Sequence, residues 1–214
     1  ILQLVTQTEN NNYYHTIPMK NIFISFLLLT LSLNLLSQQK YTIQVKIKGL
    51  TDSLAYLGTY TGKNLYFYDT AVVNKDGSFT FVNEDMPHGV YAVIPSMKPP
   101  KYFDILVNET SISLETDMNN LAGNVNVKKS KENKLFFEYV HFLEKQAKVK
   151  KPIIEERQIA YDSNETEKVT ELNKRITEID SAVIKYQIDV SEKNKDTYFG
   201  KLINMSIEIK IPEP

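Results

Sequence analysis

The side chains that could do chemistry in this sequence are few and scattered. Its three histidines are His15, His88 and His141, and none has a further ligand at the spacing of a zinc site such as His-x-x-x-His. We therefore interpret His88 and His141 as structural residues. The chain contains no cysteine, which excludes disulfides, thiolate nucleophiles and Cys-ligated zinc.

One carboxylate stands out, because Asp69 directly follows the aromatic residues Tyr66, Phe67 and Tyr68. A catalytic role would require a partner group, such as the second carboxylate of a glycosidase, and the sequence indicates none. We expect a structural hydrogen bond to a neighbouring turn instead. Four lysines form a basic stretch over 145–151 with Glu144, Glu155 and Glu156 close by, which is typical of a solvated helix face. Phosphate-binding loops, serine elbows and His-Glu-x-x-His motifs are missing, so the sequence predicts a protein that is not an enzyme and holds no cofactor or metal.

Composition restricts the function further. The chain has 214 residues, of which 42% are hydrophobic and 24% charged, with a formal net charge of −1. This length allows one or two small domains with real cores. Nucleic acid is not an expected partner, because it requires a concentrated basic surface.

The N-terminal part is typical of an export signal. Met19-Lys20 precedes a short apolar run from Ile22 to Leu36, which ends at a small residue before a polar stretch. These features predict a secretory signal peptide over 19–37, with cleavage after Ser37. A membrane anchor is the alternative, but polar residues interrupt the run and it is shorter than the roughly 20 apolar residues of a spanning helix. Residues 1–18 contain no methionine and are interpreted as a non-native upstream segment.

Residues 38–129 have the pattern of a β-domain. Tyr41, Ile43, Val45 and Ile47 alternate with polar residues, as in a half-buried strand. Further short strands are predicted at 53–60, 65–73, 78–82, 89–95, 102–107, 111–115 and 124–128. Asp76-Gly77 predicts a hairpin loop, since glycine accepts the positive φ that such loops require. About eight short strands with no βαβ pattern predict an antiparallel β-sandwich or a partly open barrel.

The apolar period changes at Ser130, a predicted helix N-cap, and residues 130–211 are predicted to be helical. The first helix places one set of apolar residues on a shared face and is broken or kinked by Pro152. That set is Phe136, Tyr139, Val140, Leu143 and Ala147. A second helix repeats apolar residues in steps of three and four from Val169 to Val190. We expect an antiparallel hairpin within one subunit, with an intermolecular coiled coil as the alternative.

A last short helix, capped by Asp196, would carry Phe199, Leu202 and Ile203. The sequence then ends in Pro212-Glu213-Pro214, which is typical of the start of a linker. The predicted fold class is therefore α+β. A sandwich or partly open barrel of about eight strands is followed by a helical hairpin and a short C-terminal helix.

Several segments resemble one family. Ile47-Lys48-Gly49-Leu50, Ala55-Tyr56-Leu57-Gly58 and the stretch from Tyr68 to Phe81 are similar to an accessory domain of unknown function. That domain precedes thioredoxin-like domains in exported proteins of Gram-negative bacteria. Ser130-Lys131-Glu132-Asn133 resembles the exit from that β-domain, and 197–202 with 212–214 resembles the helical linker behind it. The resemblance implies structural motif roles for Gly49, Asp69, Asp76, Gly77, Phe79 and Phe81.

The resemblance implies a function and a place of work. Full-length relatives would continue into a thioredoxin-like domain whose Cys-x-x-Cys motif performs thiol–disulfide exchange, an activity that a cysteine-free chain cannot share. We expect a non-catalytic accessory module, truncated before a thioredoxin-like domain in cis. It would be exported to the periplasm or outer envelope and would not stay inserted in a membrane once its signal is cleaved. The alternative is an autonomous periplasmic binding module that holds a peptide or glycan on exposed Tyr and Phe.

Overall fold

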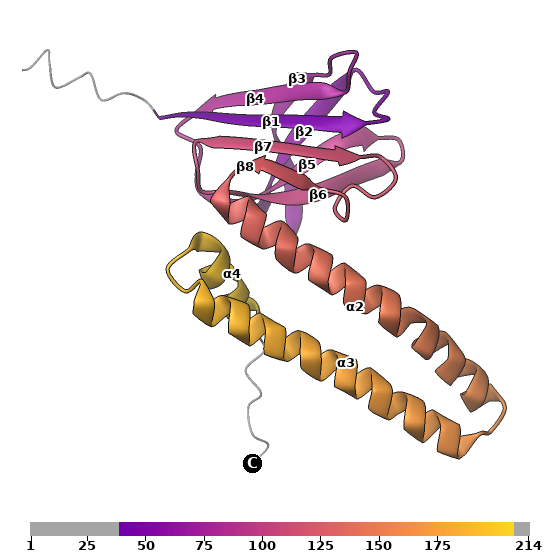
Figure 1. Cartoon of the computed structure of the whole chain (residues 1–214). Coiled ribbons are helices and arrows are strands. Elements are labelled where there is room, and N and C mark those ends of the chain that lie inside the picture. Colours follow the sequence, from indigo (N-terminus) through magenta and orange to yellow (C-terminus); the bar gives the residue numbers. More distant parts are fainter. Residues whose placement is uncertain (1–38, 208–214) are drawn as a thin grey trace, which may run out of the picture. The chain divides into compact units, whose positions relative to one another are not determined.

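The computed structural model describes residues 39–207, in which eight strands precede three helices (Figure 1). The strands are β1 (Lys40–Lys48), β2 (Leu54–Thr61), β3 (Asn64–Val72), β4 (Ser78–Glu84), β5 (Gly89–Met97), β6 (Pro100–Val107), β7 (Ser111–Asp117) and β8 (Asn126–Lys129). The helices are α2 (Lys131–Asp162), α3 (Thr166–Lys193) and α4 (Tyr198–Ser206). The predicted α+β class is confirmed. The predicted upstream segment, signal peptide and linker start lie outside the described residues, as do 208–211 of the predicted helical region.

The strands form two separate sheets rather than a barrel. Sheet A has the order β4-β1-β7-β8, and sheet B has the order β3-β2-β5-β6. All neighbours are antiparallel except β1 and β7, which run parallel with Val45 opposite Leu114. Parallel neighbours need a long connection. The five strands between β1 and β7 in the sequence provide it, and this is why strand-by-strand alternation did not predict the parallel pair.

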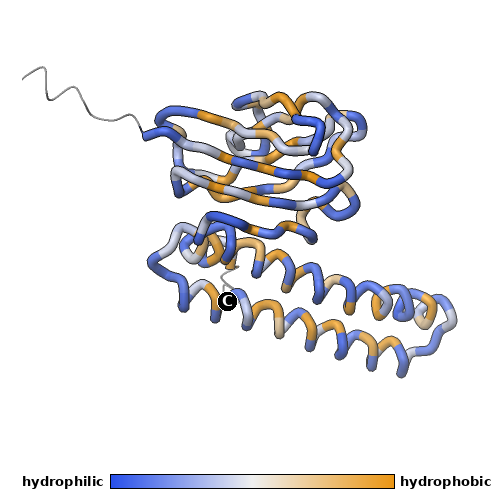
Figure 2. The backbone as a smooth tube through the Cα atoms, turned by 45° about the horizontal axis from the view of Figure 1, so that its top comes forward, coloured by the Kyte–Doolittle hydropathy of each residue, from blue (hydrophilic) through white to orange (hydrophobic). Residues whose placement is uncertain are grey.

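The sandwich core lies between the two sheets. The alternation that predicted β1 is observed, because Tyr41, Ile43, Val45 and Ile47 all point into this core and are at most 4% exposed. Figure 2 shows the same alternation of hydrophilic and hydrophobic residues along other strands. The α2 helix adds Phe137 to the cluster. Burying one large apolar side chain contributes about 1.5–3 kcal/mol, so the sandwich and the start of α2 stabilise each other.

The turn at Asp76-Gly77 differs from the prediction. It was expected to close a hairpin, but β3 belongs to sheet B and β4 to sheet A, so the turn carries the chain from one sheet to the other. The loop closes on itself through Asn74 N–H to Ser78 O at 2.8 Å. Beyond it, β4 pairs with β1 instead of returning along β3. Local turn chemistry does not determine which strand the chain pairs with next.

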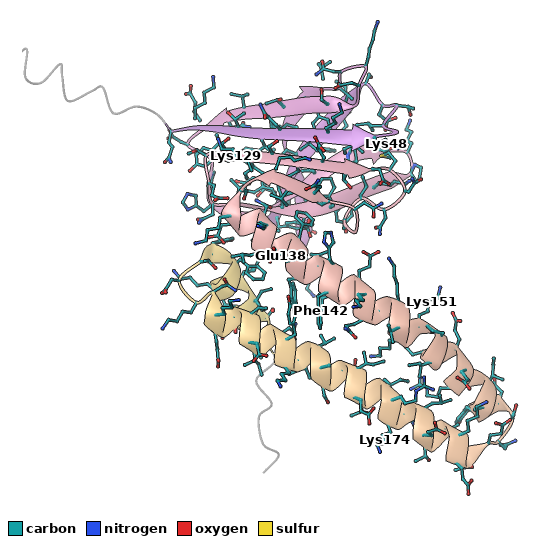
Figure 3. All side chains as sticks on the ribbon, in the orientation of Figure 1. Lys48, Lys129, Glu138, Phe142, Lys151 and Lys174 are labelled. Carbon is teal, nitrogen blue, oxygen red and sulfur yellow. The ribbon has the colours of Figure 1, made fainter. Side chains whose placement is uncertain are left out.

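The helices α2 and α3 form an antiparallel hairpin within the chain, as predicted. Phe142 of α2 points toward α3 (Figure 3), where its ring stacks on Tyr186 with the centroids 3.8 Å apart. Further along the pair, Lys150 contacts Asp180 and Arg157 contacts Asn173. The helix α2 is not broken at Pro152, so of the two expected outcomes, a break or a kink, the break does not occur. Pro152 and Lys148 are exposed, so water can bind the Lys148 carbonyl that loses its helical donor.

The apolar residues that were expected to share one face of the first helix contact two different parts of the fold. Tyr139 and Leu143 pack with α3 and α4, whereas Val140 packs against the sandwich core and Ala147 is exposed. The start of α2 contacts both the sandwich and the other helices, so its apolar surface extends around more of the helix. Within residues 39–207, no helix is both long enough and apolar enough to span a membrane.

The cap of α4 also differs by one position. Thr197, not Asp196, is the N-cap, and its hydroxyl accepts a hydrogen bond from Gly200 N–H at 2.9 Å. Its backbone is extended (φ −90°, ψ 159°), as an N-cap requires. Both residue types favour this position, so composition alone did not distinguish them.

Candidate functional site

The segment Ser130–Asn133 begins α2 and joins three parts of the fold. Ser130 is the predicted N-cap, and its hydroxyl oxygen accepts a hydrogen bond from Asn133 N–H at 3.0 Å. The same hydroxyl donates to Glu109, in the loop between β6 and β7. Glu109 also accepts from Lys131 N–H at 2.9 Å. A carboxylate at this position interacts favourably with the positive end of the helix dipole. The first turn of α2 is thus held to the sandwich.

Asn133 fastens α2 to β6. Its side chain is fully buried; Oδ1 accepts from Leu106 N–H at 2.9 Å and Nδ2 donates to Leu106 O at 2.7 Å. Because β6 is an edge strand of sheet B, these are backbone groups that an adjacent strand would otherwise bind. Leaving one such buried group unpaired costs about 1–3 kcal/mol. The side-chain amide therefore replaces a neighbouring strand at this point of the edge.

Glu132 connects the same segment to α4. Its carboxylate accepts hydrogen bonds from Tyr198 N–H at 3.1 Å and from Phe199 N–H at 2.8 Å, and the residue is only 7% exposed. Together with the Thr197 cap, it supplies acceptors for the first N–H groups of α4. Two segments that are more than 60 residues apart in the sequence therefore meet at this carboxylate.

Next to this junction, residues of α2 and α4 cover one end of the outer face of sheet B, and we call this region the covered end. It consists of Val90 and Leu106, whose side chains point away from the sandwich core. Phe199 and Ile203 of α4 and Tyr139 of α2 pack against them. Leu106 is fully buried and Phe199 is 1% exposed.

The rest of that outer face carries exposed aromatic and apolar side chains. By strand register, Tyr56, Tyr60, Leu65, Phe67 and Tyr102 lie on it, and we call these five residues the aromatic patch. Phe67 is 64% and Tyr102 is 55% exposed. Tyr56 and Phe67 make an edge-to-face pair with their centroids 5.3 Å apart. Contiguous exposed apolar surface of this kind is a common mark of an interaction site.

The carboxylate of Asp104, on β6, lies beside the aromatic patch. Tyr60 donates a hydrogen bond from its hydroxyl to Asp104 Oδ1 at 2.8 Å. Burial raises the pKa of Asp104, and the hydrogen bond from Tyr60 offsets part of that increase. Burial and the neighbouring carboxylate also raise the pKa of Tyr60. The pair places a polar contact beside the aromatic rings.

The motif residues that the resemblance singled out lie mostly along the connection from β3 to β4. Gly77 has φ +79°, and a Cβ there would collide with the backbone oxygen of Ile47 in β1. Asp76 accepts from the Ser78 hydroxyl at 2.7 Å and from Lys46 at 3.0 Å. These contacts, with the Ser78 hydroxyl first, lower the pKa of Asp76 to about 2. The turn therefore needs both residue types for its geometry.

The remaining motif residues are also placed structurally. Asp69 accepts from Asn83 Nδ2 at 2.8 Å, a contact between sheet B and sheet A, so its partner is a strand residue rather than the expected turn. Phe79 and Phe81 are at most 2% exposed in the core, with their rings edge-to-face. Gly49 has φ +81° just after β1.

The two described histidines do not converge with the motif residues. His88 Nε2 lies 3.2 Å from the Tyr41 hydroxyl, within hydrogen-bond distance. His141 packs its ring near Phe137 on α2, and its Nε2 is buried without a hydrogen-bond partner. Across the part of the chain that the structure describes, no three acidic or histidine side chains gather as metal ligands would.

Sequence reasoning expected exposed Tyr and Phe in its alternative hypothesis, but it did not locate the aromatic patch or find the hydrogen bonds of Asn133 and Glu132. A signal for the patch was present, because four apolar residues follow one another from Leu65 to Tyr68 instead of alternating. Such a run places apolar side chains on both faces of a strand. The partners of Asn133 and Glu132 are distant in sequence, and no local pattern indicates them.

Comparison with known families assigns part of the chain. Residues 41–136 match the family model described as Domain of unknown function (DUF4369). The match extends from β1 into the start of α2 and therefore includes the junction segment Ser130–Asn133. No curated protein and no solved structure matches the chain. The family model thus identifies residues 41–136 as a domain of unknown function, as the sequence resemblance indicated.

Proposed function

We propose that this chain is the non-catalytic accessory module of an exported thioredoxin-like thiol–disulfide oxidoreductase. In this proposal the β-sandwich is the accessory domain, the helices form a connector, and the redox domain lies in cis beyond Pro214. The module works in the periplasm or outer envelope of a Gram-negative bacterium. It performs no thiol–disulfide exchange itself, because that reaction needs a thiolate and the chain has no cysteine.

The observation that carries this proposal is the packing of α4 on the covered end. The chain leaves the sandwich through α2, returns through α3, and is brought back onto β6 by Phe199 and Ile203. A connector that only lengthened the chain would not need to bury those residues against the domain it came from. A returning connector instead keeps whatever follows at a defined place beside the sandwich.

Genomic sequence downstream of Pro214 tests the proposal directly. We expect the reading frame to continue into a strand, a Cys-x-x-Cys motif and a helix. A stop codon directly after Pro214 would remove the redox parent and with it the accessory role. A second test uses the protein alone: purified chain should reduce insulin no faster than buffer with dithiothreitol.

The aromatic patch supports a second candidate, an autonomous binding module for a peptide or glycan. Rigid aromatic side chains provide contact area at little entropic cost and are enriched where ligands bind. Since the chain has no tryptophan, its tyrosine fluorescence reports on Tyr56, Tyr60 and Tyr102 among other tyrosines. Titration with oligosaccharides and, separately, with extended peptides should change this emission for one class only.

Variants decide whether such a response comes from the patch. The double substitution Phe67→Ser and Tyr102→Ser should abolish it. Val82→Ser is the matched control, because Val82 is an exposed apolar residue, at 49%, on sheet A. Equal binding by the double variant and the control would exclude the patch as the binding surface.

A further inference from the structure

The helix α4 depends on contacts from outside itself. It has nine residues, and isolated helices of that length are marginal in water. Its apolar side is buried, with Phe199 at 1% and Ile203 at 5% exposure. A hydrophobic contact of this kind favours docking, but it is non-directional and does not select one orientation of the helix.

Direction comes from the carboxylate of Glu132. Its two oxygens accept from the consecutive N–H groups of Tyr198 and Phe199, so the carboxylate meets the start of α4 at one place only. Glu132 is 7% exposed and its bond to Phe199 N–H is buried, and hydrogen bonds to charged groups are worth about 1.5–3 kcal/mol. The negative charge also lies at the positive end of the helix dipole. Burial and then Glu132 raise the pKa of Tyr198, which reports the nearness of that charge.

The geometry points to Glu132 as the positioning residue that sets how α4, and therefore the chain's exit at Ile207, is held against the sandwich. This inference rests on the proposed accessory function, for which it names the contact that fixes the direction of the connector. Glu132 lies within the segment that matches the family model, whereas α4 lies beyond it. The carboxylate thus couples the β-domain to the connector.

The distance between two spin labels tests this inference. Because the chain has no cysteine, two introduced cysteines are the only sites that the labels can modify. Suitable positions are Asn126→Cys in β8 and Met205→Cys in α4, both exposed. The full chain with these labels should give one narrow distance distribution. Replacing Glu132 with alanine should broaden it and lower the exchange protection of the Phe199 amide at least about tenfold. The amides of Ile43 and Ile105 in the sandwich core should keep their protection.

Two further variants complete the test. Glu138→Gln removes a negative charge from an exposed position of the same helix (Figure 3), and it should leave distances and protection unchanged. Glu132→Gln keeps one acceptor oxygen and loses the charge, so it should give an intermediate effect and lower the pKa of Tyr198 toward its usual value. If the alanine variant does not fold, Glu132→Gln alone tests whether the carboxylate positions α4.

An unchanged distribution and unchanged Phe199 protection in both Glu132 variants would overturn the inference. That result would leave the accessory function standing, with α4 held by apolar packing alone. A stop codon after Pro214 would have the opposite effect. It would end the accessory proposal, while a broadened distribution in the Glu132 variants would still establish how α4 is positioned.

Discussion

The covered end and the aromatic patch are two parts of the same outer face of sheet B, yet α2 and α4 pack on the first, whereas Phe67 and Tyr102 of the second are mostly exposed. Both present large apolar side chains, the covered end from β5 and β6 and the patch from β2, β3 and β6. At the covered end, Asn133 binds both backbone groups of Leu106, and Glu132 binds the start of α4. Within residues 39–207, no helix supplies such polar anchors to the patch. The comparison teaches that apolar area supplies attraction, whereas buried hydrogen bonds decide where an element docks.

The largest effect should come from removing the apolar contact at the covered end. Phe199→Ala deletes a fully buried ring against Leu106 and should lower the free energy of unfolding by about 3–5 kcal/mol. Urea denaturation followed by far-UV circular dichroism measures this loss. Met205→Ala, at a position of α4 that is 77% exposed, is the control and should change little. A loss below about 1 kcal/mol for Phe199→Ala would mean that α4 docks weakly.

A somewhat smaller effect should follow from removing the polar anchor. Asn133→Ala leaves the N–H and C=O of Leu106 without partners in a buried site and should cost about 2–4 kcal/mol. The same denaturation experiment applies, and the amide of Leu106 should exchange faster with solvent. Asn126→Ala, at an exposed position in β8, provides the comparison. Equal stability of the two variants would show that water replaces the side chain at the β6 edge.

At the aromatic patch, stability should hardly respond. Phe67→Ser removes a side chain that is 64% exposed and should change the free energy of unfolding by less than about 0.5 kcal/mol. The variant should instead bind less of an apolar dye such as ANS, because the substitution removes part of the apolar surface to which the dye binds. A large loss of stability would indicate that the patch is covered by another part of the chain.

The smallest effect concerns the charge beside the patch. Because burial raises the pKa of Asp104, the folded chain holds that proton more tightly than the unfolded chain. Protonation of Asp104 therefore adds stability as pH falls from the folded toward the unfolded pKa, and this contribution is lost as pH rises through the folded pKa. An NMR titration should give a pKa above the usual value of an aspartate, and Tyr60→Phe should raise it further by removing the hydrogen bond. A value at or below that reference would contradict the assigned burial.

Much of the fold could be predicted because its signals are local. Alternation located β1, and Ser130 was recognised as the cap where the period changes. The crossing of the chain between sheets at Asp76-Gly77 could not be predicted, since a turn constrains four residues and not the strand that comes next. The site depended on distant partners: the amide of Asn133 acquires its role from Leu106, and Glu132 from Phe199. Residue type alone marks both only as ordinary members of a helix's first turn.

The central place of β1 in sheet A has a consequence for the order of folding. β1 lies between β4 and β7, so its second edge has no partner until Ser111–Asp117 has been synthesised. Pairing between segments so far apart in sequence closes a long loop and is slow. A fragment that ends before Ser111 would therefore expose one whole edge of its first strand, a template for association with other chains. Release from the ribosome before that point leaves sheet B with all its strands and sheet A with only β4 and β1, so the strand made first is among the last to be fully paired.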